Sequence, residues 1–467
     1  MYDIICNMLD KINNILWGFG TVLLVFGAGV FFTVKIRGFN FIHIVYIFKS
    51  TLFARRTDKN DKKGRISQFQ ALSTALAASM GTGNIVGVAA AISIGGAGAV
   101  FWMWVSALFG TALAFAENVL GVRYKNKGDA APMSYISNAF GRPIFGVIYA
   151  AVCAAASFGI GNMTQTNAIA SASGEIGVPP ILAGAIAAVC CGMIIFRGAK
   201  KVAEAAEKII PVISVMYFIA AVAVIVIFGE NLLPALKSIV MSAMGFCQIS
   251  GGFCGVAVKK AVSHGLRRGI FSNEAGMGSS VLVHTETDCK EPVQMGMWAV
   301  AEVVIDTIIC CTLTALVILV TGAEDSGKAG LAMAAEGFRR GLAKFTLAKF
   351  TLAKSTLAES AFGDYSAAFV AVSAIIFAFC TLLGWYFYGE KCLTFITKNK
   401  KVLYAFRVLY TAAAFAGAVS RLELVWGMAD IMNWVMLVIN LFAVIILSGE
   451  AAAETRRYIR KIKKKPK

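Results

Sequence analysis

Hydrophobic runs of roughly 20 residues, the length that spans a bilayer as a helix, recur along the whole chain between short polar and basic segments. This pattern predicts eleven membrane-spanning helices, at about 12–34, 67–95, 98–122, 143–171, 180–196, 207–229, 247–263, 293–321, 366–390, 402–418 and 424–448. The segment 264–292 is too polar to span, so we expect it to join two helices at the inner face. A long outer loop is expected at 322–365. The chain is therefore predicted to be an all-α polytopic membrane protein.

The span 67–95 has its weakest helical sequence at its centre, where Met80-Gly-Thr-Gly-Asn84 interrupts the apolar run ALAASMGTGNIVGVAAAI. The span is also long, about 43 Å at 1.5 Å per residue against a hydrocarbon core of about 30 Å. A break frees backbone groups, which is favourable in a membrane only when a ligand binds them. We expect the freed carbonyls to suit Na⁺ and the N-terminal end of the half-helix to suit a carboxylate. The alternative is that the small residues only permit close helix packing.

Setting the first helix aside leaves ten spans, five in each half. An odd number of spans per half gives the halves opposite orientations, as in an inverted repeat. The expected organisation is an N-terminal helix and basic connector (1–66), a first repeat (67–229), a second repeat (230–448) and a basic tail (449–467). The first helix of the second repeat contains Gly251-Gly-Phe-Cys-Gly255, so we expect a matching break there, with Gly252 near the substrate.

Charge supports the membrane interpretation and predicts an orientation. Only 15% of the residues are charged and 58% are hydrophobic, whereas soluble domains carry about 25% charged residues. When the spans are threaded alternately, 35 of the 44 Lys and Arg residues fall on one face, including five within 259–290. That face is expected to be cytoplasmic, with the C-terminus inside and the N-terminus outside. The tail from Arg456 is expected to anchor on anionic lipid, and the net charge of +18 needs no nucleic-acid partner.

No enzyme signature accompanies this pattern. The glycines at 81, 83 and 87 miss the spacing of a dinucleotide-binding loop, and the sequence has no phosphate-binding loop, HExxH or GxSxG motif. The eleven cysteines form no CxxC pair and the three histidines are scattered. We therefore expect neither catalysis nor a bound cofactor.

Polar residues inside other spans have two interpretations. The sequence GIGN at 159–162 is followed by TQTN at 164–167, and such side chains are costly in a membrane unless they line a cavity or bond to neighbouring helices. Both roles stay open for this segment. The ionisable Glu117 is expected to have a structural role near the inner interface. Asp306 either helps a cation site or, as we expect, holds two helices together.

A further group of candidates lies in the span 366–390. Phe377, Cys380 and Thr381 share one helix face because they are spaced three and four residues apart. The Thr381 hydroxyl can complete an oxygen shell around Na⁺ beside loosened carbonyls. Trp385, one turn further on, is placed to close a pocket over a small apolar side chain, although tryptophan also anchors helices at membrane interfaces.

The stretch GGAGAVFWMWVSALFG, from Gly95 to Gly110, resembles the GGxGAxFWMW motif of the alanine/glycine:cation symporters, also called the sodium:alanine symporter family. The stretches GTGNIVGVA, GIGNMTQTNAIA, RGIFSNEAGMGS and FAFCTLLGWYFYGE resemble further blocks of that family in the same order. The resemblance covers about 67–450 and is highly specific.

This resemblance implies a LeuT-like 5+5 inverted repeat with one extra N-terminal helix. It also implies import of small neutral amino acids, alanine or glycine, with Na⁺, or with H⁺ in some members, by alternating access. Together with Asn84 and Gly252 from the two breaks, the implied substrate-binding residues are Ser79, Thr82, Gly83, Gln165 and Trp385. The implied Na⁺ site comprises the carbonyls of Ala77, Met80 and Phe377 together with Cys380 and Thr381.

Two departures from the family pattern leave alternatives open. Cys380 stands where the family has serine, which weakens an oxygen ligand and keeps an H⁺-coupled symporter as the first rival. The tandem repeat LAKFTLAKFTLAKSTLAES at 342–360 is not a family feature and is expected to be a tolerated expansion in the outer loop. An ion channel is the remote rival, because two inverted halves favour a transporter. The expected location is the plasma membrane of a prokaryote.

Overall fold

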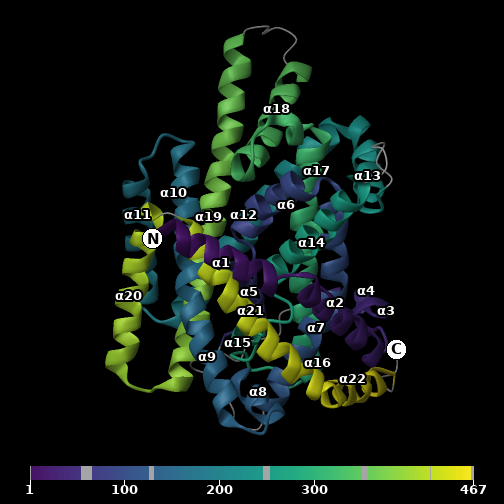
Figure 1. The fold of residues 1–467 in the computed structure, drawn as a ribbon, viewed down its shortest axis with the longest axis vertical. Coiled ribbons are helices and arrows are strands. Elements are labelled where there is room, and N and C mark those ends of the chain that lie inside the picture. The colour runs from purple at the N-terminus through teal and green to yellow at the C-terminus, as the bar shows by residue number, and fades with distance from the viewer. Residues whose placement is uncertain are drawn as a thin grey trace.

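The computed structural model describes residues 2–53, 66–125, 131–245, 253–349, 356–420 and 422–463. Nearly all of these residues are helical, and the β contact found within these ranges is an isolated bridge between Ile66 and Thr287. The helices pack into one bundle, from which α18 and the start of α19 rise at one end (Figure 1). The prediction of an all-α polytopic membrane protein is confirmed.

Eight helical segments of the described chain are long and apolar enough to cross a bilayer. They are α1–α2 (Tyr2–Leu16, Phe19–Lys35), α7 (Gly98–Lys125), α9–η2–α10 (Pro143–Phe158, Gly159–Met163, Thr164–Gly174), α12 (Ala199–Ile227), α16–η3–α17 (Pro292–Val303, Val304–Cys311, Thr312–Val320), α19 (Thr356–Ile396), α20 (Lys400–Val419) and α21 (Leu422–Ile446). A ninth is formed if α5 (Gln68–Ser79) and η1–α6 (Gly83–Gly87, Val88–Gly95), which are bent by 52°, count as one broken span.

Each of these nine segments coincides with a predicted span. The remaining two predicted spans correspond to α11 (Pro180–Ile195), which is shorter, and to α14 (Phe253–Asn273), which is not among the apolar segments. The other helices are α3 (Phe39–Ile42), α4 (Ile44–Ser50), α8 (Met133–Ala139), α13 (Gly229–Ala243), α15 (Val281–His284), η4 (Ala323–Ser326), α18 (Gly330–Lys349) and α22 (Ser448–Lys463).

Helix α14 is longer than the sequence predicted. The predicted connector 264–292 is wrong at its start, because the helix continues to Asn273 and packs along the first half of α7. Gly265 permits this contact, since a Cβ there would lie 2.3 Å from the Ala99 carbonyl oxygen. Gly269, one turn on, meets Ser106 in the same way. The two backbones thus approach as at other small-residue helix interfaces in membranes.

The path of α7 shows where the charges of α14 lie. While the start of α7 packs against α14, its end carries Arg123, which pairs with Glu450 and Glu454 of the C-terminal helix α22 at 2.5 Å each. Helix α14 carries four basic residues, which therefore lie near the end of α7 that is opposite α22: Lys259, Lys260, Arg267 and Arg268. The prediction that they lie at the same face as the C-terminal tail was wrong. Most other basic residues are unaffected, so the charge bias keeps its direction.

The predicted outer loop 322–365 is wrong as a loop, because much of it is helical. Helix α18 packs antiparallel beside α19, which begins at Thr356, and the two form the projection in Figure 1. Glu336 of α18 is nearly buried and pairs with Arg339 at 2.6 Å and Arg340 at 3.0 Å. These ion pairs favour a helix because their members are three and four residues apart.

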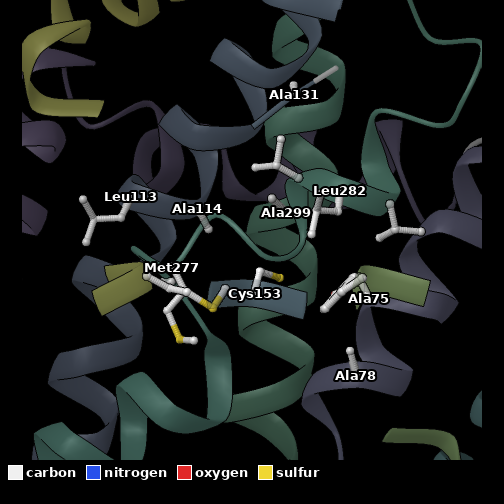
Figure 2. Packing of buried hydrophobic residues seen from close by; sticks show 14 of the residues in the cluster. Ala75, Ala78, Leu113, Ala114, Ala131, Cys153, Met277, Leu282 and Ala299 are labelled. Atoms are coloured by element: carbon white, nitrogen blue, oxygen red, sulfur yellow. The ribbon is translucent and has the colours of Figure 1, made fainter. Parts of the chain in front are cut away.

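Small side chains let the central helices approach closely. Ala75 and Ala78 of α5 lie in one cluster with Ala114 of α7 and Cys153 of α9 (Figure 2). Gly384 of α19 sits directly against α5, since a Cβ there would lie 2.7 Å from the Ala78 backbone. Close packing of α5 and α19 positions the next turn of each helix, and the candidate site lies there.

Candidate functional site

The first spanning segment of the predicted repeats is broken where the sequence predicted. Helix α5 ends at Ser79, Met80 has non-helical backbone angles, and regular winding resumes at Gly83 in η1. The two parts differ in direction by 52°. The break at Met80–Asn84 is therefore confirmed.

The structure places a second break at Glu274–Ser280, between α14 and α15, where none was predicted. Gly251 and Gly252 lie outside the described residues, and Gly255 belongs to α14. The chain unwinds after Asn273 because Gly276 and Gly278 adopt φ of +92° and +72°, values that favour glycine. The last turn of α14 lies beside the first break, since a Cβ on Gly83 would lie 4.0 Å from the Ser272 Cα.

A cavity of about 340 Å³, its mouth included, lies between the two breaks. Its lining residues come from α5, the first break, η2, α10, α14, the second break, α19 and α21: Ala78, Ser79, Gly81, Gly83, Ile160, Gln165, Phe271, Glu274, Met277, Thr381, Trp385 and Asn433. Five of these were predicted as site residues: Ser79, Gly83, Gln165, Thr381 and Trp385. Residues from both sequence halves therefore meet in one enclosed space.

Two buried hydroxyls lie at the first break, those of Ser79 and Thr82. Ser79 lines the cavity, and the Thr82 hydroxyl has no hydrogen-bond partner among the described residues. The Thr82 N–H donates to Gln165 Oε1 at 3.4 Å, and Gln165 Nε2 donates to the Ile160 carbonyl at 3.0 Å. A buried hydroxyl without a partner costs roughly 1–3 kcal/mol, so a ligand that bonds these groups gains that energy.

Three oxygen atoms converge beside the first break. Thr381 Oγ1 donates to the Ala77 carbonyl at 2.9 Å and to the Phe377 carbonyl at 3.2 Å. Gly81 lies against the same hydroxyl, because a Cβ there would be 2.3 Å from Thr381 Oγ1. The Ala77 carbonyl at the helix break, the Phe377 carbonyl of the continuous helix α19 and the Thr381 hydroxyl are oxygen ligands of the kind that a hard cation such as Na⁺ prefers.

The other two predicted Na⁺ ligands, the Met80 carbonyl and Cys380, stay predictions. The hydrogen bonds of this cluster join Ala77, Phe377 and Thr381, and the Met80 and Cys380 side chains are buried in the surrounding hydrophobic core. The Met80 sulfur lies 3.9 Å from the hydroxyl of Ser214 on α12. Among the described residues no group of three or more His, Cys, Asp or Glu is arranged to hold a metal ion, so the oxygen cluster is a neutral site.

Asn84 lies next to the break but bonds away from the cavity. Its Nδ2 donates to Asp306 Oδ1 at 2.8 Å, and the Ser272 hydroxyl donates to the other carboxylate oxygen at 2.6 Å. Asp306 thus ties η1, α14 and η3 together, which is the structural role expected for it. Asn84 was predicted to contact substrate, and its amide instead supports the geometry of both breaks.

Residues 159–167 have both of the roles left open by the sequence. Gln165 lines the cavity, whereas Asn162 donates to the Tyr410 carbonyl at 2.7 Å and ties η2 to α20. Gly161 allows Trp385 to approach, since a Cβ there would be 2.1 Å from the Trp385 Cβ. The glycine therefore fixes the position of the indole that closes one side of the cavity.

Four lining residues were missed by the sequence analysis: Phe271, Glu274, Met277 and Asn433. Glu274 is the one carboxylate among the lining residues, and it is nearly buried, with Oε2 accepting from the Ser279 hydroxyl at 2.5 Å. The signal was an acidic residue beside alternating glycines in NEAGMGS. Glu274 was not assigned to the substrate because this segment was placed in a polar connector.

Side chains from the surrounding helices hold the second break in place. Asn440 of α21 donates to the Gly276 carbonyl at 2.8 Å and to Glu117 of α7 at 2.7 Å. Its Oδ1 accepts from the Tyr135 hydroxyl of α8 at 2.5 Å. Because every polar atom of this buried amide is bonded, its orientation is fixed, and with it the carbonyl of Gly276.

Comparison with known proteins places this architecture in a family. The chain is 35% identical over 97% of its length and 97% of the relative to "Sodium/alanine symporter AgcS" of Methanococcus maripaludis. It is 34% identical to "Probable sodium/glutamine symporter GlnT" of Bacillus subtilis, covering 99% of this chain and 92% of the relative. It is 32% identical to "Putative sodium/proton-dependent alanine carrier protein YrbD" of the same organism, covering 98% and 93%.

The family profile gives the same result over nearly the whole chain. The profile described as "Sodium:alanine symporter family" matches residues 2–467. The family and these relatives are transporters, so the prediction that the chain is not an enzyme is confirmed. With its broken helices, its enclosed cavity and a match from end to end, the chain belongs to the sodium:alanine symporter family.

Proposed function

We propose that this protein is a Na⁺-coupled symporter that imports alanine and glycine by alternating access. The observation that carries the proposal is that candidate substrate-binding hydroxyls and a candidate cation-binding oxygen cluster lie at the same break, between α5 and η1. The Ser79 hydroxyl lines the cavity with the unpartnered Thr82 hydroxyl three residues on, and three oxygens converge beside the same break. Broken helices at corresponding places in two repeats are typical of secondary transporters with a midplane site.

The lining residues suit a small zwitterion. The substrate carboxylate would bind at the first break, to the Ser79 and Thr82 hydroxyls and to N–H groups at the N-terminal end of η1. The substrate ammonium would bind Glu274 across the cavity. Trp385 and Ile160 would enclose a small side chain, and Gln165 would fix the Thr82 backbone.

The coupling ion would bind the oxygen cluster of Ala77, Phe377 and Thr381, with the Met80 carbonyl and Cys380 as the further candidates from the family resemblance. A cation there would order the residues on both sides of Gly81. The same residues present the hydroxyls to the substrate, so binding of the ion would favour binding of the amino acid.

The order of the breaks along the chain supports a LeuT-like arrangement. If α11 and α14 are counted as spans, α5 to α12 and α14 to α21 each provide five, and each half begins with a broken helix. The charge bias then puts the N-terminus outside and the C-terminus in the cytoplasm of a prokaryotic cell, with α22 against anionic lipid.

Reconstitution into proteoliposomes tests the proposal. With an inward Na⁺ gradient, radiolabelled alanine uptake should saturate, and it should be inhibited by unlabelled glycine but not by glutamine, the substrate named for one relative. Replacing Na⁺ by choline should abolish uptake. Uptake that persists in choline and follows a pH gradient would contradict Na⁺ coupling and support the H⁺-coupled rival. Flux that does not saturate would support a channel.

A further inference from the structure

The N-terminal helices α1 and α2 precede the two predicted repeats, and they are fastened to α21. In Figure 1, α1 lies alongside α21. Three side-chain hydrogen bonds join them: Asn13 Nδ2 to the Gly427 carbonyl at 2.9 Å, Trp17 Nε1 to the Asp430 carbonyl at 3.1 Å, and Trp434 Nε1 to Thr21 Oγ1 at 2.9 Å. Trp17 also contacts a second helix, α14.

Trp17 lies on an ion pair between α14 and α21. The Arg267 guanidinium pairs with the Asp430 carboxylate, and it also lies over the Trp17 ring, 5.7 Å from the ring centre. The Arg267 and Asp430 side chains are 24% and 15% exposed, so the pair is shielded but not sealed from solvent. One tryptophan therefore contacts both residues of the pair, the Arg267 guanidinium through its ring and the Asp430 backbone carbonyl through its N–H.

This ion pair lies within one helical turn of the cavity on both helices. Phe271, four residues after Arg267, lines the cavity, and so does Asn433, three residues after Asp430. The Phe271 ring also packs on Trp426 of α21, with ring centres 5.8 Å apart. Helices α14 and α21 are thus joined at the cavity wall by one ionic and one aromatic contact.

We infer that Arg267 and Asp430 close the cavity between α14 and α21, and that Trp17 is a positioning residue through which the N-terminal helices control how readily this closure opens. The inference rests on the proposed function, because alternating access requires one wall of the cavity to part. A partly exposed ion pair suits a contact that must break and re-form, since water can replace each partner. By contacting the Arg267 guanidinium and the α21 backbone at Asp430, Trp17 limits how far the two residues can separate.

Release of bound substrate tests this role. Purified protein is loaded with radiolabelled alanine in Na⁺ and then diluted into excess unlabelled alanine. Loss of the indole in Trp17→Leu should speed dissociation about three- to tenfold, because a hydrogen bond and a cation–π contact are lost. Trp17→Phe keeps a ring over Arg267 and should give a smaller increase. The matched control is Trp434→Phe, which removes an indole hydrogen bond between the same helices without touching the ion pair, and it should leave the rate unchanged.

A double-variant cycle separates positioning from general loosening of the fold. Trp17→Leu should add little to Arg267→Ala, because Trp17 acts through the pair that Arg267→Ala has already removed. Equal effects of Trp17→Leu and Trp434→Phe, or additive effects of Trp17→Leu and Arg267→Ala, would overturn the inference while leaving the proposed function intact. If the unmodified protein fails to bind alanine in Na⁺, both the proposed function and this inference fall.

Discussion

Gly81→Ala gives a direct test of the link between the first break and the ion site. An alanine Cβ at this position would lie 2.3 Å from Thr381 Oγ1 and 3.1 Å from Gln165 Oε1. Real Cβ contacts essentially never fall below 3.0 Å, so the hydroxyl or the backbone must move by about 0.7 Å. The Thr381 hydroxyl has little room to do so, because it is held at 2.9 Å from the Ala77 carbonyl.

The magnitude follows from the loss of one oxygen ligand. An interaction between a polar group and a charge contributes about 1.5–3 kcal/mol, and 1.4 kcal/mol is tenfold in affinity. Displacing Thr381 Oγ1 should therefore raise the half-saturating Na⁺ concentration roughly ten- to hundredfold. Saturating Na⁺ should restore most of the alanine uptake, since the substrate groups of Ser79 and Thr82 are not displaced.

The assay is alanine uptake into proteoliposomes as a function of Na⁺ concentration. Gly87→Ala is the matched control, because it adds the same methyl group six residues further on, at the end of η1, where the nearest atom is 4.0 Å away. In a Thr381→Ala background, Gly81→Ala should have little further effect on Na⁺ dependence. If Gly81→Ala and Gly87→Ala shift the half-saturating Na⁺ concentration equally, the placement of the ion beside Thr381 is wrong.

Three further variants test the substrate site, the contacts that support the two breaks, and the projection formed by α18 and the start of α19. Glu274→Gln should weaken alanine binding roughly tenfold or more, measured by equilibrium binding in saturating Na⁺, because it removes the charge facing the ammonium; unchanged affinity would exclude that role. Asp306→Ala should lower stability in detergent by roughly 3 kcal/mol or more, since several donors lose their acceptor, whereas Asp306→Asn should cost less. Hydrogen bonding from Arg339 holds the pKa of Glu336 well below its usual range, so this carboxylate stabilises α18 above the unfolded pKa of about 4.3 and the effect is lost as pH falls through the lower folded pKa. Hydrogen exchange of α18 should therefore accelerate at acid pH in the unmodified protein and depend less on pH in Glu336→Gln.

The sequence predicted the helices best where hydrophobic length alone decides them. Nine predicted spans coincide with apolar helical segments, and the break at Met80–Asn84 lies where the helix formers are weakest. The prediction failed for α14, because its residues pack on α7 through Gly265 and Gly269 rather than facing lipid. Hydropathy measures exposure to lipid, so it does not detect a polar helix that is buried against another helix.

The sequence predicted only part of the candidate site, because it does not show how distant segments pack against one another. Residues around a broken helix stand out in the sequence, and Ser79, Gln165 and Trp385 do line the cavity. Whether a polar residue faces the cavity or a neighbouring helix depends on packing across the chain. Asn84 was therefore assigned to the substrate although it bonds to Asp306, and Glu274 was missed because its segment looked like a surface connector.

Helix α21 carries contacts at two places that bear on the cavity. Asp430 meets the arginine of α14, and Asn440, ten residues later and about 15 Å along the axis, holds the carbonyl of Gly276. A continuous helix turns as a rigid rod, so a rotation that separates Asp430 from its partner also displaces Asn440 unless the rod bends. The Asp430 and Asn440 contacts are therefore coupled through the rigid helix. A substitution that stiffens or kinks α21 between these two residues would change whether the contacts break together, without altering either contact directly.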